Sequence, residues 1–262
     1  MLIVEGPQDA QCIGSLLSPS QFKRVTNSEQ LPEEWRVIVN TTFPAKGRGI
    51  NQPHAVPHFY RREDGILVAI VVAGSDSQLA TALAAQLDVL KDTQDIPLTP
   101  AAIGYILDRD HKDTPAKRHE TLLKKLTELE VAFAFPLQPG TVSADAPRTG
   151  VFIVPDNQNQ GTLEDVLLES GAVAYEPQIQ QATAFVDMFD KAGLTEDDTE
   201  EGRKPSGRKK QIVGTVAAML KPGRALATTL QDNRWLKGDA LNTPLAIGLR
   251  KWLHELLDLH PL

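Results

Sequence analysis

Carboxylates follow two short apolar segments of this chain, at the point where each segment ends. Glu5 comes directly after Leu2–Val4, and Asp108 and Asp110 follow Ala102–Leu107. If both segments are strands of an open parallel sheet, their carboxyl ends can meet at one edge, where ligands bind in such sheets. Three carboxylates there repel one another unless a cation lies between them, and oxygen ligands suit Mg²⁺ or Mn²⁺. The pattern therefore predicts a divalent-metal site at this edge.

Each of these carboxylates also has a purely structural explanation. Asp108 and Asp110 lie two residues apart, so both face the same side of an extended chain. However, aspartate is also common in the turns that end strands. Asp9, a further candidate metal ligand, lies at the start of an expected helix, where the helix dipole favours a carboxylate. For Glu5 the alternative is a solvated strand end, but its place at the exit of the first strand favours a functional role.

A third apolar run is followed by another acidic segment. Thr162 and Asp165 have the spacing of a capping box, with Asp165 in the place that Glu or Gln usually takes. Asp165 therefore has a structural explanation. Glu164 lies off the apolar stripe of the same helix, so it is a candidate metal ligand or general base and, equally, a solvated side chain.

The densest positive segment of the chain contains Arg208, Lys209 and Lys210. These side chains could contact the phosphate backbone of a nucleic acid. The alternative is a solvated linker whose charges pair with the acidic residues at 196–201.

The apolar patterns describe the elements that would position these residues. Continuous runs rich in Ile and Val are typical of strands buried on both faces. Their alternation with helical patterns predicts an α/β fold, a mainly parallel sheet flanked by helices, with a helical C-terminal extension. We expect strands over Leu2–Val4, Trp35–Asn40, Ile66–Val72, Ala102–Leu107, Val131–Phe135 and Val151–Val154, and an irregular loop over Phe43–Tyr60. We expect helices over Ala10–Leu17, Gln78–Leu90 and Arg118–Leu129, one from Thr162 that ends near Gly171, and C-terminal helices over Ile212–Leu220, Leu226–Gln231 and Pro244–Leu257.

These elements suggest three parts of the chain. Residues 1–190 are expected to form the α/β domain, 191–210 a polar linker, and 211–262 a helical region packed on the first domain. A chain of 262 residues is long enough for such an arrangement.

Composition narrows the class of protein. The single cysteine, Cys12, excludes an intrachain disulfide and a multi-cysteine zinc module, and it fits a reducing compartment. We find no secretory leader and no apolar run of about 20 residues, so we expect a cytoplasmic protein without a membrane partner. The net charge of −7 argues against a broad nucleic-acid-binding face but not against a nuclease, because metal ions offset site carboxylates.

The segments Leu2–Asp9 and Ile106–Asp110 together resemble the TOPRIM superfamily, which includes DnaG-type primases, topoisomerases and OLD nucleases. The segment Val154–Asp165 resembles the acidic segment of OLD-type nucleases and of a family of small stand-alone TOPRIM-like proteins of unknown function. The resemblance covers residues 1 to about 170. It implies that Glu5 acts in acid–base catalysis and that Asp108 and Asp110 hold Mg²⁺ or Mn²⁺.

The activity that this resemblance implies is metal-dependent phosphodiester hydrolysis by a stand-alone nuclease. One alternative is a phosphatase of the haloacid-dehalogenase type with Asp108 as nucleophile, although Lys112 stands where Thr or Val is usual. Another is a non-catalytic TOPRIM-like scaffold that binds a metal and a nucleotide or protein partner. A homodimer is compatible with each alternative, and DNA, RNA, tRNA and nucleotides all remain open as substrates.

Overall fold

The strands form one mixed sheet in the computed structural model, which describes residues 1–39, 56–92, 99–109, 113–189 and 192–259. The strand order is β2-β3-β4-β1-β5-β6. Strands β4, β1, β5 and β6 are parallel, whereas β2 and β3 are antiparallel to their neighbours. The expected α/β fold is thus confirmed. The strands are β1 (Leu2–Val4), β2 (Lys23–Arg24), β3 (His58–Arg61), β4 (Leu67–Val72), β5 (Ala102–Asp108) and β6 (Arg148–Val154).

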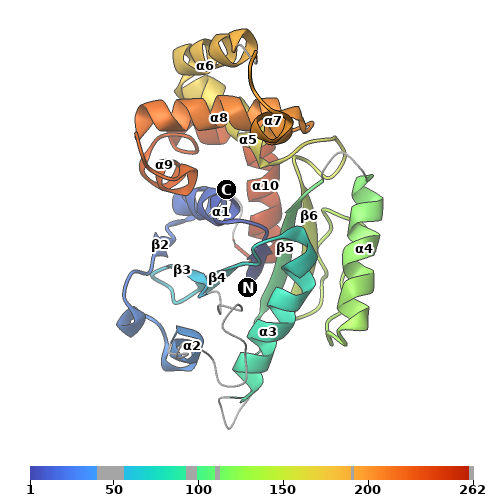
Figure 1. Ribbon diagram of the computed structural model, residues 1–262. Coiled ribbons are helices and arrows are strands. Elements are labelled where there is room, and N and C mark those ends of the chain that lie inside the picture. The colour runs from blue at the N-terminus through green and yellow to red at the C-terminus, as the bar shows by residue number, and fades with distance from the viewer. Residues whose placement is uncertain (40–55, 93–98, 110–112, 190–191, 260–262) are drawn as a thin grey trace.

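Different helices cover the two faces of the sheet (Figure 1). Because successive side chains of a strand point to opposite faces, Leu2 and Val4 contribute to one apolar core and Ile3 to the other. The first core is completed by α1 (Pro7–Leu17) and α10 (Pro244–Leu256) and the second by α3 (Leu79–Asp92) and α4 (Pro115–Glu128). Both faces are therefore buried, as the continuous apolar runs predict.

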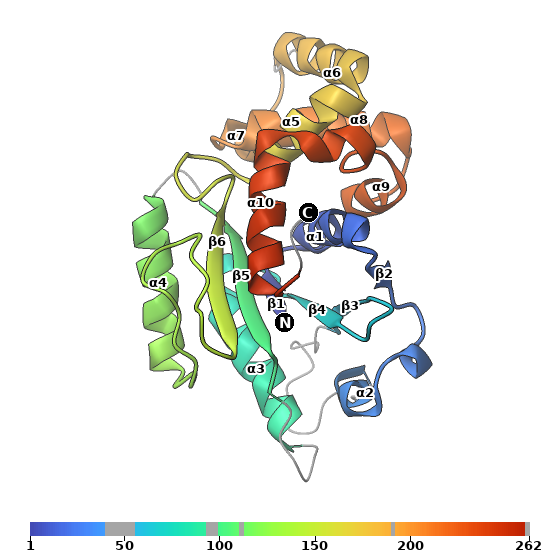
Figure 2. The ribbon, with the colours of Figure 1, turned by 180° about the vertical axis from the view of Figure 1, so that it is seen from behind.

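The remaining C-terminal helices form a layer beyond α1 (Figure 1). They are α5 (Leu163–Ala174), α6 (Glu176–Met188), α7 (Glu196–Arg203), α8 (Gly207–Leu220) and α9 (Leu226–Asp232). Helix α9 packs on α1, and α8 packs on α5 and α6. The chain then returns to the sheet, where α10 lies along β5 and β6 (Figure 2). None of the helices in the described ranges combines the length and apolar character that a bilayer crossing requires.

Two of the expected strands are wrong. Residues 33–39 form α2 (Glu33–Val39), in which Trp35 packs edge-on against Phe59. A short apolar run cannot be distinguished from a helix by periodicity alone. Residues 131–135 belong to no strand: Val131, Phe133 and Phe135 pack against the core on one face of the sheet, and the Thr149 hydroxyl of β6 donates to the Ala134 carbonyl (2.6 Å).

Other boundaries also differ from expectation. Helix α5 continues through Gly171 and ends at Ala174. This glycine serves packing instead, since a Cβ there would lie 2.9 Å from Cζ3 of the buried Trp235. Residues 191–210, the expected linker, contain the exposed helix α7 and the start of α8. Most of the expected loop at 43–60 lies outside the described residues, but its last three residues begin β3.

Helix α1, which supplies residues to the site described below, lies close to the sheet because of Gly14. A Cβ at this position would lie 2.0 Å from the hydroxyl of the buried Tyr60. We expect Gly14→Ala to lower the free energy of unfolding by about 1–3 kcal/mol, the usual cost of overpacking. Urea unfolding measures the change. In the control Gly214→Ala, the new Cβ meets nothing within 4 Å. Because alanine has a higher helix propensity than glycine, this variant should have a free energy of unfolding about 0.5–1 kcal/mol above that of the wild type. Equal effects of the two substitutions would contradict this packing account.

Candidate functional site

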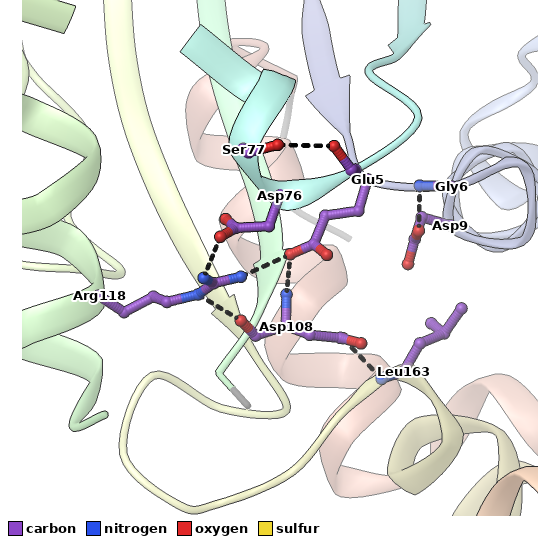
Figure 3. A network of polar contacts seen from close by, with 9 residues as sticks. Glu5, Gly6, Asp9, Asp76, Ser77, Asp108, Arg118 and Leu163 are labelled. Carbon is purple, nitrogen blue, oxygen red and sulfur yellow. Dashed lines mark hydrogen bonds and ion pairs between the residues drawn. The ribbon is translucent and has the colours of Figure 1, made fainter. Parts of the chain in front are cut away.

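Two of the predicted site residues meet at the carboxyl edge of the sheet. Glu5 follows β1, and Asp108 is the last residue of the neighbouring β5. The backbone N–H of Asp108 donates to Oε1 of Glu5 at 3.1 Å (Figure 3). The parallel register, in which Val4 pairs with Ile106, places both strand ends at this edge.

An arginine that the sequence analysis did not identify fixes this edge. The guanidinium of Arg118, from α4, donates from Nη2 to Oε1 of Glu5 at 2.8 Å and from Nε to the carbonyl of Asp108 at 2.8 Å (Figure 3). Its Nη1 lies 2.7 Å from Oδ2 of Asp76. One signal was present in the sequence: Arg118 lies near the N-terminus of α4, where a cation is disfavoured unless an anion compensates it.

The other candidate carboxylates lie in the first turns of two helices. Oδ2 of Asp9 accepts from the backbone N–H of Gly6 at 2.7 Å, which is the structural role weighed for it above. Oε2 of Glu164 accepts from the hydroxyl of Thr162 at 2.6 Å. Asp108 also contacts this helix, because its Oδ1 accepts from the N–H of Leu163, the first residue of α5, at 2.8 Å.

One cavity of about 390 Å³ brings these carboxylates together. It is lined by four of the predicted carboxylates, namely Glu5, Asp9, Asp108 and Glu164. Asp110, the fifth predicted carboxylate, lies outside the described residues. The remaining lining residues are Gly6, Gln8, Gly74, Ser75, Leu163, Lys210 and Leu226.

The three basic candidates have different surroundings. Only Lys210 lines the cavity. Lys209 forms an ion pair with Asp165 at 2.5 Å, and Arg208 forms two contacts of 2.8 Å with Asp187. The capping role expected of Asp165 is present as well, since its Oδ2 accepts from the N–H of Thr162 at 2.9 Å.

The crowding of carboxylates changes their acidity. Burial raises the pKa of Asp9 to about 7, and the negative charges of Glu5 and Glu164 add to the effect. Burial also raises the pKa of Asp108 well above its usual range, with further contributions from Asp9, Glu5 and Glu164. The hydrogen bond from Leu163 opposes this rise. The cavity therefore favours groups that reduce its negative charge, which are protons or cations.

Comparison with known proteins places the chain in a family. A family model described as "Protein of unknown function (DUF3226)" matches residues 1–258. The chain belongs to this family. No curated protein matches it. Among solved structures, it is similar to the crystal structure of hypothetical protein PH0156 from Pyrococcus horikoshii OT3, with 17% identity, 97% of this chain and 93% of that chain covered, and a TM-score of 0.46.

The donor set of this DUF3226 protein fits a hard divalent cation, because each candidate ligand is a carboxylate. Within the described ranges, no three Asp, Glu, His or Cys side chains are grouped closely enough to hold a metal ion by themselves. Mg²⁺ commonly keeps several water ligands and binds through one or two carboxylates, so it does not require such a cage. Asp108 and Glu164 each have a second oxygen that the hydrogen bonds above do not use.

The raised pKa of Asp9 makes stability depend on pH in a defined direction. Without metal, the native state holds a proton on Asp9 between pH 3.8 and about 7, whereas the unfolded chain releases it. The stability of the wild type should therefore fall as pH rises through this range. Asp9→Asn keeps an oxygen that accepts from Gly6 and removes the titration. We expect the variant to match the wild type near pH 4 and to be about 2–4 kcal/mol more stable at pH 8.

Urea unfolding in a chelating buffer at several pH values measures this difference. Asp88→Asn, which changes an exposed residue of α3, is the matched control and should follow the wild type at each pH. If the stability of Asp9→Asn depended on pH in the same way as that of the wild type, the loss of stability with rising pH would not come from Asp9.

Proposed function

We propose that this DUF3226 protein is a stand-alone nuclease of the TOPRIM type, which hydrolyses phosphodiesters with the help of Mg²⁺ or Mn²⁺. The observation that supports the proposal is the shared cavity. Carboxylates from the ends of β1 and β5 and from the first turns of α1 and α5 line it together with one lysine. A nuclease of this kind would act in the cytoplasm, where the single thiol of Cys12 stays reduced.

Three residues are proposed as metal ligands on the cavity side: Asp108, Glu164 and Asp9. Asp110 stays a predicted ligand. A divalent cation in this place would offset the negative charge that develops on the phosphate during hydrolysis. It would also offset the two effects that raise the pKa of Asp108, which are burial and, after it, the neighbouring negative charges.

Glu5 is proposed to accept the proton of the attacking water. Its carboxylate is held by two donors, the N–H of Asp108 and the guanidinium of Arg118, while 24% of its side chain stays exposed. A general base needs a fixed position and access to the reactant, and Glu5 has both. Lys210 on the same cavity offers a positive charge for a phosphate oxygen.

The geometry favours this function over the phosphatase. Asp108 would be the nucleophile of a phosphatase, but its Oδ1 accepts a hydrogen bond from the N–H of Leu163, which holds this oxygen against α5. An oxygen held in this way is less available for attack on a phosphate.

The test of the proposed function is a cleavage assay with the purified full-length chain. Labelled single-stranded DNA, duplex DNA, structured RNA and p-nitrophenyl phosphate are incubated with Mn²⁺, with Mg²⁺ or with a chelator. We expect cleavage of a polymer with either metal and none with the chelator. Turnover of the monoester alone would favour the phosphatase, and binding of metal without any turnover would favour the scaffold.

A further inference from the structure

The cavity has a second wall that faces the edge of the sheet. Lys210 from α8 and Leu226, the first residue of α9, line it from this side. The ion pair between Lys209 and Asp165 connects α8 to the first turn of α5, directly beside Glu164. Because α9 also packs on α1, these helices lie over the site from two directions (Figure 1).

This wall limits the size of a group that can enter the cavity beside the carboxylates. A volume of 390 Å³ equals that of a sphere of about 9 Å diameter, which is in the range of pockets for small ligands. The major groove of B-form DNA alone is about 12 Å wide, so a duplex is far broader than this space. The side chain of Glu5 is only 24% exposed at the cavity surface. A single strand can bend so that one nucleotide enters such a cavity, as strands do in nucleic-acid-binding channels.

The charges on the cavity wall distinguish one basic residue from its neighbours. The charges of Lys209 and Arg208 are compensated by Asp165 and Asp187. Lys210 has the charge of Glu201 nearby, but unlike Lys209 and Arg208 it lines the cavity with the carboxylates, where it can bind a phosphate oxygen as a point charge. A strand whose phosphate contacts Lys210 would enter the cavity that Glu5 and Asp108 also line.

From these observations we infer that the cavity selects single-stranded nucleic acid, and that Lys210 is the residue that binds a backbone phosphate of the strand there. The inference rests on the proposed function and adds the substrate class to it. The helices α8 and α9 exclude the duplex, and Lys210 binds the backbone of the strand.

Binding without turnover tests the inference. Fluorescence anisotropy is measured for a labelled DNA dodecamer, for the RNA of the same sequence and for the annealed duplex, with Ca²⁺ as the divalent cation. We expect a single strand to bind at least about tenfold more tightly than the duplex. Lys210→Gln should weaken this binding about tenfold and reduce the slope of log K against log salt by about 0.7, as expected for the loss of one phosphate contact. Lys210→Arg should restore most of the affinity.

Arg208→Gln is the matched control, since it removes the same charge from the same helix outside the cavity lining, and it should bind like the wild type. Equal affinity for strand and duplex, or equal losses in Lys210→Gln and Arg208→Gln, would overturn the inference. Competition by a mononucleotide as strong as that by the dodecamer would also overturn it in favour of free nucleotides. Binding of single strands through Lys210 without cleavage would support the inference while contradicting the proposed nuclease. Equal cleavage of strand and duplex would support the proposed nuclease while contradicting the inference that the cavity selects single strands.

Discussion

Glu5→Gln is expected to lower the rate of metal-dependent phosphodiester cleavage by about 10²- to 10⁴-fold, the usual contribution of a general base. Glutamine has the same shape and keeps an oxygen that accepts from Asp108 and Arg118. It cannot accept a proton from water, so the chemical step should fail while the fold stays intact. Single-turnover cleavage measures the rate, and thermal unfolding shows whether the structure is retained.

The matched control for this variant is Glu120→Gln, which makes the same change at an exposed position of α4. It should cleave at the rate of the wild type. If Glu5→Gln also cleaves at the wild-type rate, Glu5 is not the general base. If Glu5→Gln loses both activity and metal binding, Glu5 acts as a ligand instead.

Arg118→Met is expected to reduce both stability and activity. The guanidinium is only 10% exposed and contacts two carboxylates and one carbonyl. Its removal leaves Glu5 without its cation, close to Asp108, so we expect a loss of about 2–3 kcal/mol in the free energy of unfolding. We expect cleavage to fall by at least about tenfold, because Glu5 is no longer held in one position.

Three further variants distinguish positioning from a general loss of stability. Lys117→Met, one residue away, breaks only an exposed pair with Glu120 and should cost no more than about 0.5 kcal/mol. Arg118→Lys should restore part of the activity. In a background of Glu5→Gln, Arg118→Met should cost less stability than in the wild type, because the partly buried negative charge that loses the guanidinium is absent. Equal costs in both backgrounds would refute the coupling between Arg118 and Glu5.

The sequence was sufficient for the parts of the fold that depend on local pattern. The apolar runs that became β1, β4, β5 and β6 are buried on both faces, and this burial is what their composition predicts. Glu5 and Asp108 follow two of these runs, so their meeting required only that the strands be neighbours. The capping position of Asp165 was predicted from a spacing of three residues.

The rest depends on tertiary packing that no local pattern encodes. Residues 33–39 have an apolar content that fits a strand, but they form a helix that packs on Phe59. Arg118 lies more than a hundred residues from Glu5 in sequence, and only the placement of α4 brings them together. Lys209 pairs with Asp165, whereas Lys210 lines the cavity. This difference follows from how α8 packs on α5, and the charges of the segment alone do not specify that packing.

The central claim is that a divalent cation binds among the carboxylates of this cavity, and iron-directed cleavage of the protein itself tests it most directly. Fe²⁺ is bound in place of Mg²⁺, ascorbate and peroxide are added, and the positions of backbone cuts are identified by mass spectrometry. We predict cuts near Glu5–Asp9, near Asp108 and near Leu163–Glu164, all suppressed by excess Mg²⁺ and absent in Asp108→Asn. Cuts elsewhere in the chain, or cuts that persist unchanged in Asp108→Asn, would contradict the account.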